Sequence, residues 1–425
     1  MAGRHSRSSN LKFATRRRRK VPLRLLAFIA ALIVVVVVVI LVLAETSPVP
    51  DLRVQRALPA TIRFPGPPPA PAWPKGGEAA AEVEGLGTLG SSGPQTPLPI
   101  ASVAKIMTAY VILKDHPVKV GQSGFQVTVN AADVADYRRR LAAGELVVQV
   151  SPGEVLNEVQ LLQALLVASA NNVAPILATY DAGSVPAFVA KMNATARGLG
   201  MTRTTYAGAS GISSATVSTA GDQLKLAAAA MADPVFARIV AMTSVNLPVA
   251  GVLANFNHAV GTGGYVGIKA GSDSIAGGCL VFANRQTVSG RPVTIVGVVL
   301  GQDPGHASTT VLTAAAQSAA DGIVHSVVAS LRSATILPAG TAVATVSNRQ
   351  GGHAEATTAT AIKGVGWGGL QVPVQVSLLP VGRSIRPGTA VARVGVPSGL
   401  PGAATASTSG AVPAVSFSWR VGHIF

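Results

Sequence analysis

The sequence predicts an α+β protein in which helices cover an antiparallel sheet, with a small C-terminal all-β domain and an N-terminal transmembrane helix. Three observations lead to this fold class. Apolar residues first recur with the helical period, and strand-like apolar runs separated by short turns follow from about residue 266. A further helical run closes this unit, and beyond about residue 331 only short strand-like runs remain. Strands joined by short turns pair antiparallel, and the helices before and after them cover the sheet.

The first 44 residues predict a membrane anchor. Residues 1–24 contain nine lysines and arginines and no acid, and the twenty residues Leu25–Ala44 carry no charge. At about 1.5 Å per residue these twenty span roughly 30 Å, the thickness of a bilayer core. Basic residues beside a span stay in the cytoplasm. We therefore expect a cytoplasmic tail over 1–24, a single-pass cell-membrane anchor over 25–44 and an extracytoplasmic remainder, whereas cleavage after Ala44 stays open.

The basic tail has a second interpretation, because a run of arginines also binds nucleic acid. The apolar span directly behind it favours the membrane, and no nucleic-acid partner is expected. Residues 45–76 are rich in proline and show neither a helical nor a strand period. This composition is typical of a stiff, extended spacer, which would lift the globular part off the membrane.

The remaining elements are predicted from periodicity and turn residues. Within the unit 77–330, helices are expected over 101–115, 154–170, 184–199, 219–232 and 309–328, strands over 266–268, 279–283 and 293–300, and a turn over 284–292. Within the all-β domain 331–425, strands are expected over 339–346, 370–378 and 389–396, a flexible loop over 397–411 and a last strand over 415–419.

Histidine and cysteine usage argues against metal chemistry. The seven histidines are scattered without metal-ligand spacing, so neither a metal nor another cofactor is expected. Cys279 has no second cysteine to pair with and lies in an apolar run, as a small buried residue does. Glu154 and Glu158 are expected to be solvated or to cap a helix, and residues 137–140 to form a solvated surface turn.

Ser102 and Lys105 are the strongest candidates for chemistry. They lie three residues apart in an apolar stretch of helical period, Ile100–Tyr110, and therefore share one helix face. A serine hydroxyl is a poor nucleophile until a base removes its proton, and a lysine desolvated among apolar side chains has a lowered pKa that suits this role. The pair predicts a nucleophile with its own base.

Two further short patterns follow in the chain. Ser169 and Asn171, separated by one alanine, come after a strongly apolar helix, and Lys269-Ala270-Gly271 lies in a strand where glycine permits close approach of another backbone. Each pattern also recurs elsewhere in the sequence. These recurrences are Ser9 with Lys12, Ser244 with Asn246, and Lys75-Gly76-Gly77. The interpretation therefore depends on the order of the three patterns in the chain and on the predicted elements in which they lie.

With these motifs and their flanks, residues 77–330 resemble the low-molecular-mass penicillin-binding proteins, the serine D-alanyl-D-alanine carboxypeptidases. The flanks include Leu166–Asn172, Val217–Ala220 and Gly267–Asp273. The resemblance implies a penicillin-binding or β-lactamase-like fold with a helical subdomain, no cofactor, and β-lactam antibiotics as acylating inhibitors. It also implies an enzyme that trims the terminal D-alanine from peptidoglycan stem peptides.

The same resemblance assigns roles by position. Ser102 is the implied nucleophile and Lys105 its base, while Ser169 and Asn171 relay a proton and hold the substrate amide. Lys269 supplies positive charge for the substrate carboxylate, in a segment that includes Ala270, Gly271 and Ser272. The implied oxyanion hole uses backbone N–H groups of Ser102 and of the strand near residues 272 and 273.

One position departs from the family pattern, because the expected threonine is Ala270. A lost hydroxyl contact to the carboxylate costs about 1–3 kcal/mol, so turnover is expected to fall rather than vanish. Ser272 shares a strand face with Ala270 and is expected to supply part of this contact. Two other interpretations stay open: a β-lactamase, although no glutamate-bearing loop of that family is recognisable between Asn172 and Gly267, and a catalytically silent wall scaffold.

Overall fold

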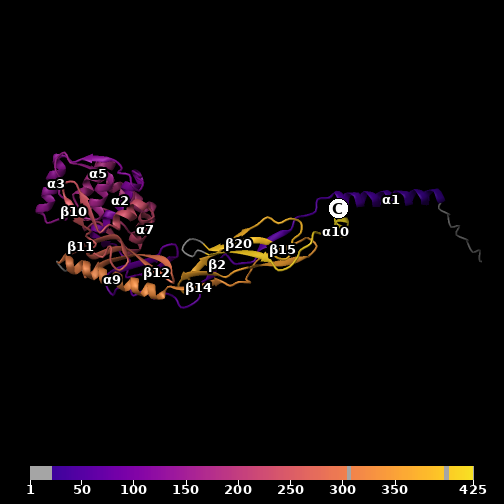
Figure 1. Ribbon diagram of the computed structural model, residues 1–425. Helices are drawn as coiled ribbons and strands as arrows, with labels where there is room; N and C mark the ends of the chain where they lie inside the picture. The colour runs from indigo at the N-terminus through magenta and orange to yellow at the C-terminus, as the bar shows by residue number, and fades with distance from the viewer. Residues whose placement is uncertain (1–21, 304–307, 397–401, 425) are drawn as a thin grey trace, which may run out of the picture.

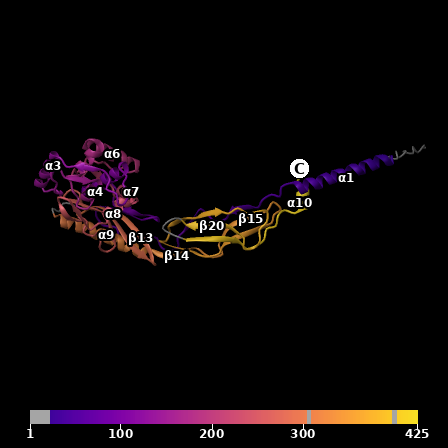
Figure 2. The same cartoon turned by 45° about the horizontal axis from the view of Figure 1, so that its top comes forward.

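The computed structural model describes residues 22–303, 308–396 and 402–424, which form three successive parts. Figures 1 and 2 show a long helix, α1 (Leu23–Thr46), at one end, a β-rich unit in the middle and a mixed helix–sheet unit at the other end. The predicted fold class is confirmed, including the sheet covered by helices and the C-terminal β-rich part.

The mixed unit is built on a five-stranded antiparallel sheet in the order β11-β12-β13-β3-β4. These strands are β11 (Tyr265–Asp273), β12 (Gly277–Val288), β13 (Arg291–Gln302), β3 (Glu78–Val83) and β4 (Gly87–Ser92). Strand β11 lies at one edge of the sheet and packs beside a short 3₁₀ helix, η1 (Ala101–Ala104). No further strand pairs with the outer edge of β11 in the part of the chain that the structure describes.

Two features of this sheet differ from the sequence prediction. The expected turn over residues 284–292 shrinks to Ser289 and Gly290, because β12 and β13 pair almost to their ends. Strand β3 is missing from the prediction because its alanines have little strand propensity. Its alanines are nevertheless buried between two cores, since small side chains let layers pack closely on both faces.

Helices cover both faces of the sheet. One face carries a group of helices and a first apolar core, and the other carries the single long helix α9 (Thr309–Ser330) and a second core. The helices of the first face are α2 (Lys105–Asp115), α3 (Ala131–Ala142), α4 (Glu158–Leu166), α5 (Val173–Ala182), α6 (Val185–Gly198), α7 (Ala220–Met231) and α8 (Pro234–Val240). Helix α2 packs against α4, α5, α6 and α7 and forms the centre of this layer.

Short strand pairs connect these helices. They are β5 (Leu98–Pro99) with β8 (Val217–Ser218), β6 (Gln126–Thr128) with β7 (Val155–Asn157), and β9 (Ser244–Leu247) with β10 (Gly251–Ala254). The helix predicted from residue 154 therefore starts only at Glu158, where Asn157 and Gln160 form a capping box. The expected surface turn over 137–140 is instead part of α3, which an Asn130–Asp133 capping box begins.

The β-rich unit combines a six-stranded sheet with two strand pairs. The sheet has the order β1-β15-β16-β21-β20-β19, and β14 pairs with β17 and β18 with β2. The strands are β1 (Arg53–Arg56), β2 (Thr61–Arg63), β14 (Arg332–Leu337), β15 (Ala342–Ser347), β16 (His353–Thr358), β17 (Ile362–Gly366), β18 (Gln371–Pro373), β19 (Gln375–Leu378), β20 (Ala390–Val396) and β21 (Gly402–Thr408).

The expectation of a stiff, extended spacer without strands over residues 45–76 is wrong for its central part. Strands β1 and β2 pair with β15 and β18, and Leu52 and Phe64 are buried in the β-rich unit. The prolines lie outside these two strands, so they remove no ladder hydrogen bond. The proline-rich segment is therefore partly an integral piece of the β-rich unit.

Two expectations near the C-terminal end are also wrong. Of the loop expected over 397–411, residues 402–408 form β21 between β16 and β20, while residues 397–401 lie outside the described part of the chain. Small residues in this stretch suit a central strand because its alternate side chains, such as Ala404 and Ala406, are buried. The expected strand over 415–419 is instead a short helix, α10 (Phe417–Val421), which Ser416 caps.

Among the described residues, α1 is the one unbroken helix that is long and apolar enough to cross a membrane. A signal sequence near an N-terminus has the same length and composition. The C-terminal end of α1 packs beside α10. The segment that enters the β-rich unit and the segment that leaves it therefore meet at one place.

Replacing Phe64 with alanine tests whether the proline-rich segment is folded. Phe64 is 1% exposed and packs with Ile336 and Val372. The substitution should destabilise the β-rich unit by about 3–5 kcal/mol and speed tryptic cleavage after Arg56 and Arg63. The exposed Pro68→Ala is the control and should cleave at the wild-type rate. Equal rates for both variants would mean that this segment is not packed.

Candidate active site

Ser102 and Lys105 meet where η1 passes into α2. Ser102 lies in the 3₁₀ turn and Lys105 is the first residue of the α-helix. Side chains three residues apart eclipse one another in a 3₁₀ helix, and Lys105 Nζ lies 2.8 Å from Ser102 Oγ. Ala101 before the serine has a left-handed φ of 45°, a conformation that needs support from the surrounding structure.

Lys105 is completely buried, and three oxygens surround its nitrogen. Nζ donates to Ser102 Oγ at 2.8 Å, to Asn171 Oδ1 at 2.6 Å and to the Ser210 carbonyl at 2.9 Å. An amide oxygen and a carbonyl oxygen only accept hydrogen bonds, whereas a hydroxyl also donates. When Lys105 is neutral, Ser102 is therefore the neighbour that can give a proton to its lone pair.

Burial favours the neutral amine of Lys105 over the charged ammonium. It lowers the pKa of Lys105 well below its usual range, and the nearby positive charge of Lys269 lowers it further. Glu145 acts in the opposite direction, and no carboxylate forms an ion pair with Lys105 among the described residues. The arrangement thus favours a base over a permanently charged ammonium.

The segment after α4 brings Asn171 to the same place. Its backbone N–H donates to the Leu146 carbonyl at 2.8 Å, and Asn172 exchanges two hydrogen bonds with the Val148 backbone. Ser169 has a left-handed φ of 60°, and its buried hydroxyl has no hydrogen-bond partner within the described residues. An unsatisfied buried hydroxyl costs about 1–3 kcal/mol, so this one favours a ligand that supplies the missing contact.

Lys269 on β11 is also almost fully buried, at 1% exposure. Its Nζ donates to the Ala270 carbonyl at 2.7 Å and lies 5.1 Å from the centre of the Phe256 ring. Burial lowers the pKa of Lys269 to about 7. An incoming carboxylate would offset this desolvation and favour the charged form.

Gly271 explains how close β11 lies to the nucleophile. A Cβ atom at this position would lie 2.8 Å from the Ser102 backbone nitrogen and 3.0 Å from that of Val103. Only a residue without a side chain permits this approach. Gly211 permits a similar close approach to the residue before Ser102, because a Cβ atom at position 211 would lie 1.9 Å from the Ala101 carbonyl oxygen.

Ala270 and Ser272 lie on the opposite strand face from Lys269 and Gly271, and the pairing of β11 with β12 is regular there. Ala270 is 5% exposed and belongs to the core under α9. It also borders a cavity of about 250 Å³ that Asn257 and Thr313 help to line. The Ser272 hydroxyl and the Asn257 amide nitrogen are both buried without a partner in the described residues.

Sequence reasoning missed the Ser210 carbonyl and the Phe256 ring. A backbone acceptor leaves no side-chain signature, and an aromatic ring in an irregular segment resembles any core residue.

Glu158, expected to be solvated or a cap, is 1% exposed, and burial raises its pKa to about 7. None of the hydrogen bonds that the structure shows for Glu158 involves a candidate site residue. Glu154 caps the turn at Ser151 as expected.

Replacing Lys269 with methionine tests the burial of its charge. The folded pKa of about 7 lies below the usual 10.5, so between these values the unfolded chain binds more protons. The free energy of unfolding should therefore rise with pH from 7 to 9, by up to about 1.4 kcal/mol per pH unit for this group. Urea titrations at several pH values should show that the free energy of unfolding depends less steeply on pH in Lys269→Met than in the wild type. The exposed control Lys114→Met should keep the wild-type slope. Equal slopes in all three proteins would contradict this burial.

Comparison with known proteins places this geometry in a family. The family model described as D-alanyl-D-alanine carboxypeptidase matches residues 87–303, about half of the chain. A D-alanyl-D-alanine endopeptidase of Pseudomonas aeruginosa is 30% identical over 49% of this chain and 66% of its own. The D-alanyl-D-alanine carboxypeptidase DacB2 of Mycobacterium tuberculosis is 37% identical over 35% of this chain and 48% of its own. The chain thus spans about half to two thirds of these relatives.

Solved structures lead to the same family. The Streptomyces K15 DD-transpeptidase has 28% identity and a TM-score of 0.50, covering 58% of this chain and 95% of that one. The D-alanyl-D-alanine carboxypeptidase DacD of Francisella tularensis shares the fold over 82% of this chain and 96% of its own, with a TM-score of 0.54 at 17% identity. All three motifs fall within the matched residues, and the chain belongs to the D-alanyl-D-alanine carboxypeptidase family.

Proposed function

We propose that this protein is a serine-type D-Ala-D-Ala carboxypeptidase that removes the terminal D-alanine from peptidoglycan stem peptides. The observation that carries the proposal is the contact of 2.8 Å between the Lys105 amine and the Ser102 hydroxyl, at a lysine whose pKa burial lowers. Family membership and the carboxypeptidase and endopeptidase names of its relatives support the substrate class.

The chemistry follows from which groups can exchange protons. Neutral Lys105 takes the Ser102 proton while Oγ forms a bond to the carbonyl carbon of the penultimate residue. Backbone N–H groups of Ser102 and of β11 stabilise the oxyanion. The carbon–nitrogen bond then breaks, the proton passes to the leaving D-alanine amine, and an ester remains on Ser102. Water attacks this ester in the second half, which restores the serine and releases the shortened peptide.

Ser169 and Asn171 take the supporting roles in this proposal. The Asn171 amide oxygen positions the Lys105 amine, and its NH₂ group is available for a substrate carbonyl. The unpartnered Ser169 hydroxyl is suited to carry the proton from Lys105 towards the leaving amine. Lys269 and the backbone at Gly271 would receive the terminal carboxylate from one face of β11, and the unpartnered Ser272 hydroxyl would contact it from the other face at the strand edge.

For the chain as a whole, we propose that α1 anchors the protein in the cell membrane. Residues 1–24 would be cytoplasmic and the β-rich and mixed units extracytoplasmic. The apolar length of α1 and the basic residues before it support this orientation. The mixed unit over 77–330 would carry catalysis. The β-rich unit over 331–425, together with the paired strands β1 and β2, would act as the spacer.

Fluorescent penicillin labelling tests the nucleophile, because a β-lactam ring is an amide that acylates such a serine. The purified protein should bind one label per chain, and Ser102→Ala should bind none. The control is Ser244→Ala, which alters the exposed serine of the recurring Ser-x-Asn pattern and should label fully. Label that persists in Ser102→Ala would place the nucleophile elsewhere.

Restoring the family threonine tests carboxylate binding. The cavity beside Ala270 has room for a larger side chain, and Ala270→Thr should raise kcat/KM for a D-Ala-D-Ala peptide by about tenfold. An ester substrate without that carboxylate is the control and should change little. Ser272→Ala should lower the wild-type value. No effect from either substitution would leave carboxylate binding to Lys269 and the backbone alone.

Reporter fusions test the proposed orientation. A reporter that is active only outside the cytoplasm should be active when it is fused after Phe425. A matched reporter that works only in the cytoplasm should be silent there. The reverse pattern would overturn the orientation and, with it, access to a wall substrate.

A further inference from the structure

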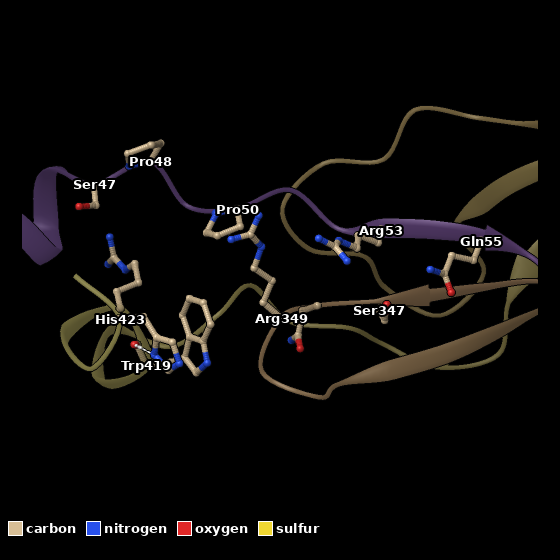
Figure 3. Close-up of a pocket in the computed structure, with 11 residues that line it drawn as sticks. Ser47, Pro48, Pro50, Arg53, Gln55, Ser347, Arg349, Trp419 and His423 are labelled. Atoms are coloured by element: carbon tan, nitrogen blue, oxygen red, sulfur yellow. Dashed lines mark hydrogen bonds between the residues drawn. The ribbon is translucent and has the colours of Figure 1, made fainter. Parts of the chain in front are cut away.

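A second pocket lies at the opposite end of the protein from Ser102. Its volume is about 730 Å³, and it opens between the segment that leaves α1, the turn after β15 and helix α10. The lining contains three arginines, Arg53, Arg349 and Arg420, together with His423, and no carboxylate belongs to the lining. Figure 3 shows Arg349 extending from the β-rich unit towards Pro50 on the N-terminal segment.

Two of these arginines have no protein partner. The side chains of Arg53 and Arg349 form neither an ion pair nor a hydrogen bond with any residue that the structure describes, and both residues are exposed. Arg420 differs, because its side chain is 15% exposed and lies 3.6 Å from Glu45. Glu45 and Asp51 are the nearby acids. Both are largely exposed, and Asp51 faces Arg383, so the pocket keeps an excess of positive charge.

The pocket lies where a membrane surface would be. Ser47, the first residue after α1, belongs to its lining. The end of a membrane-spanning helix reaches the level of the lipid headgroups, where tryptophan side chains also concentrate. In this pocket the rings of Trp419 and His423 stack with their centres 4.0 Å apart, and the neighbouring Phe417 is 40% exposed. This step rests on the proposed anchor.

We propose that this pocket binds the phosphate of an anionic phospholipid headgroup in the extracytoplasmic leaflet. Guanidinium groups present planar pairs of donors that match a phosphate, and Arg53 and Arg349 have their donors free for it. The two arginines line the same pocket but come from separate segments, the strand β1 and the turn after β15, so a phosphate held between them would tie both segments to the membrane. A bound lipid would hold the β-rich unit against the surface and set the direction in which the mixed unit points (Figure 1).

Calorimetric titration of the full-length protein in a neutral detergent tests this assignment. The probes are dihexanoyl phosphatidylglycerol, dihexanoyl phosphatidylcholine and inorganic phosphate. Phosphatidylglycerol should bind at least tenfold more tightly than either of the others. The double variant Arg53→Gln/Arg349→Gln should weaken its binding at least tenfold, and Arg53→Lys/Arg349→Lys should recover part of it because the charges remain.

The matched control is Arg386→Gln/Arg393→Gln, which removes the same charge from exposed positions of the same unit and should leave binding unchanged. An equal loss in this control, or equal affinity for both lipids, would overturn the site. Binding of inorganic phosphate as tight as that of phosphatidylglycerol would overturn the headgroup assignment. Ser102→Ala should bind the lipid as the wild type does while losing penicillin labelling, so the two proposals stand or fall separately.

Discussion

The burial of the Lys105 amine among three oxygens is the interaction on which the site depends. A charged ammonium at this depth would be costly, and no carboxylate pairs with it in the described residues. The Asn171 and Ser210 oxygens compensate part of this cost and leave the amine next to Ser102. The same burial that costs stability therefore lowers the pKa of Lys105 and suits its amine to the proposed role of base.

The two-layer packing keeps this lysine in place. Helix α2 is central in the helical layer, so the helices around it fix Lys105 from several sides. The edge strand β11 approaches Ser102 because Gly271 has no side chain, and α9 supports that strand from the other face. Ser102, the proposed nucleophile, thus lies between helix α2 and an edge strand of the sheet, a setting that would suit a peptide added to the sheet as one more strand.

The β-rich unit follows a different logic. Its sheet takes strands from both ends of the chain, because β1 precedes the mixed unit in sequence and β15 follows it. This exchange ties the segment that leaves α1 to the far end of the polypeptide. It also brings arginines from distant segments to one pocket beside the end of α1. Chain connectivity alone would not create that cluster.

The sequence by itself determined the contact between Ser102 and Lys105, the anchor-like span and the order of the main elements. Ser102 and Lys105 are close in sequence, so helical geometry alone predicts their contact. The helix boundaries of α6, α7 and α9 also followed closely from period and capping residues. Local interactions decide these features, and local interactions are visible in a sequence.

Only the tertiary structure decided the rest. Ser210 lies 105 residues from Lys105, and it contributes a backbone carbonyl that no residue type reveals. The alanines of β3 and β21 became strands because neighbouring strands and cores paired with them, against their own weak propensity. The proline-rich segment likewise gained its strands from partners more than 280 residues away in the chain. Contacts of this range depend on the packing of the whole chain, so their physical cause lies outside any local pattern.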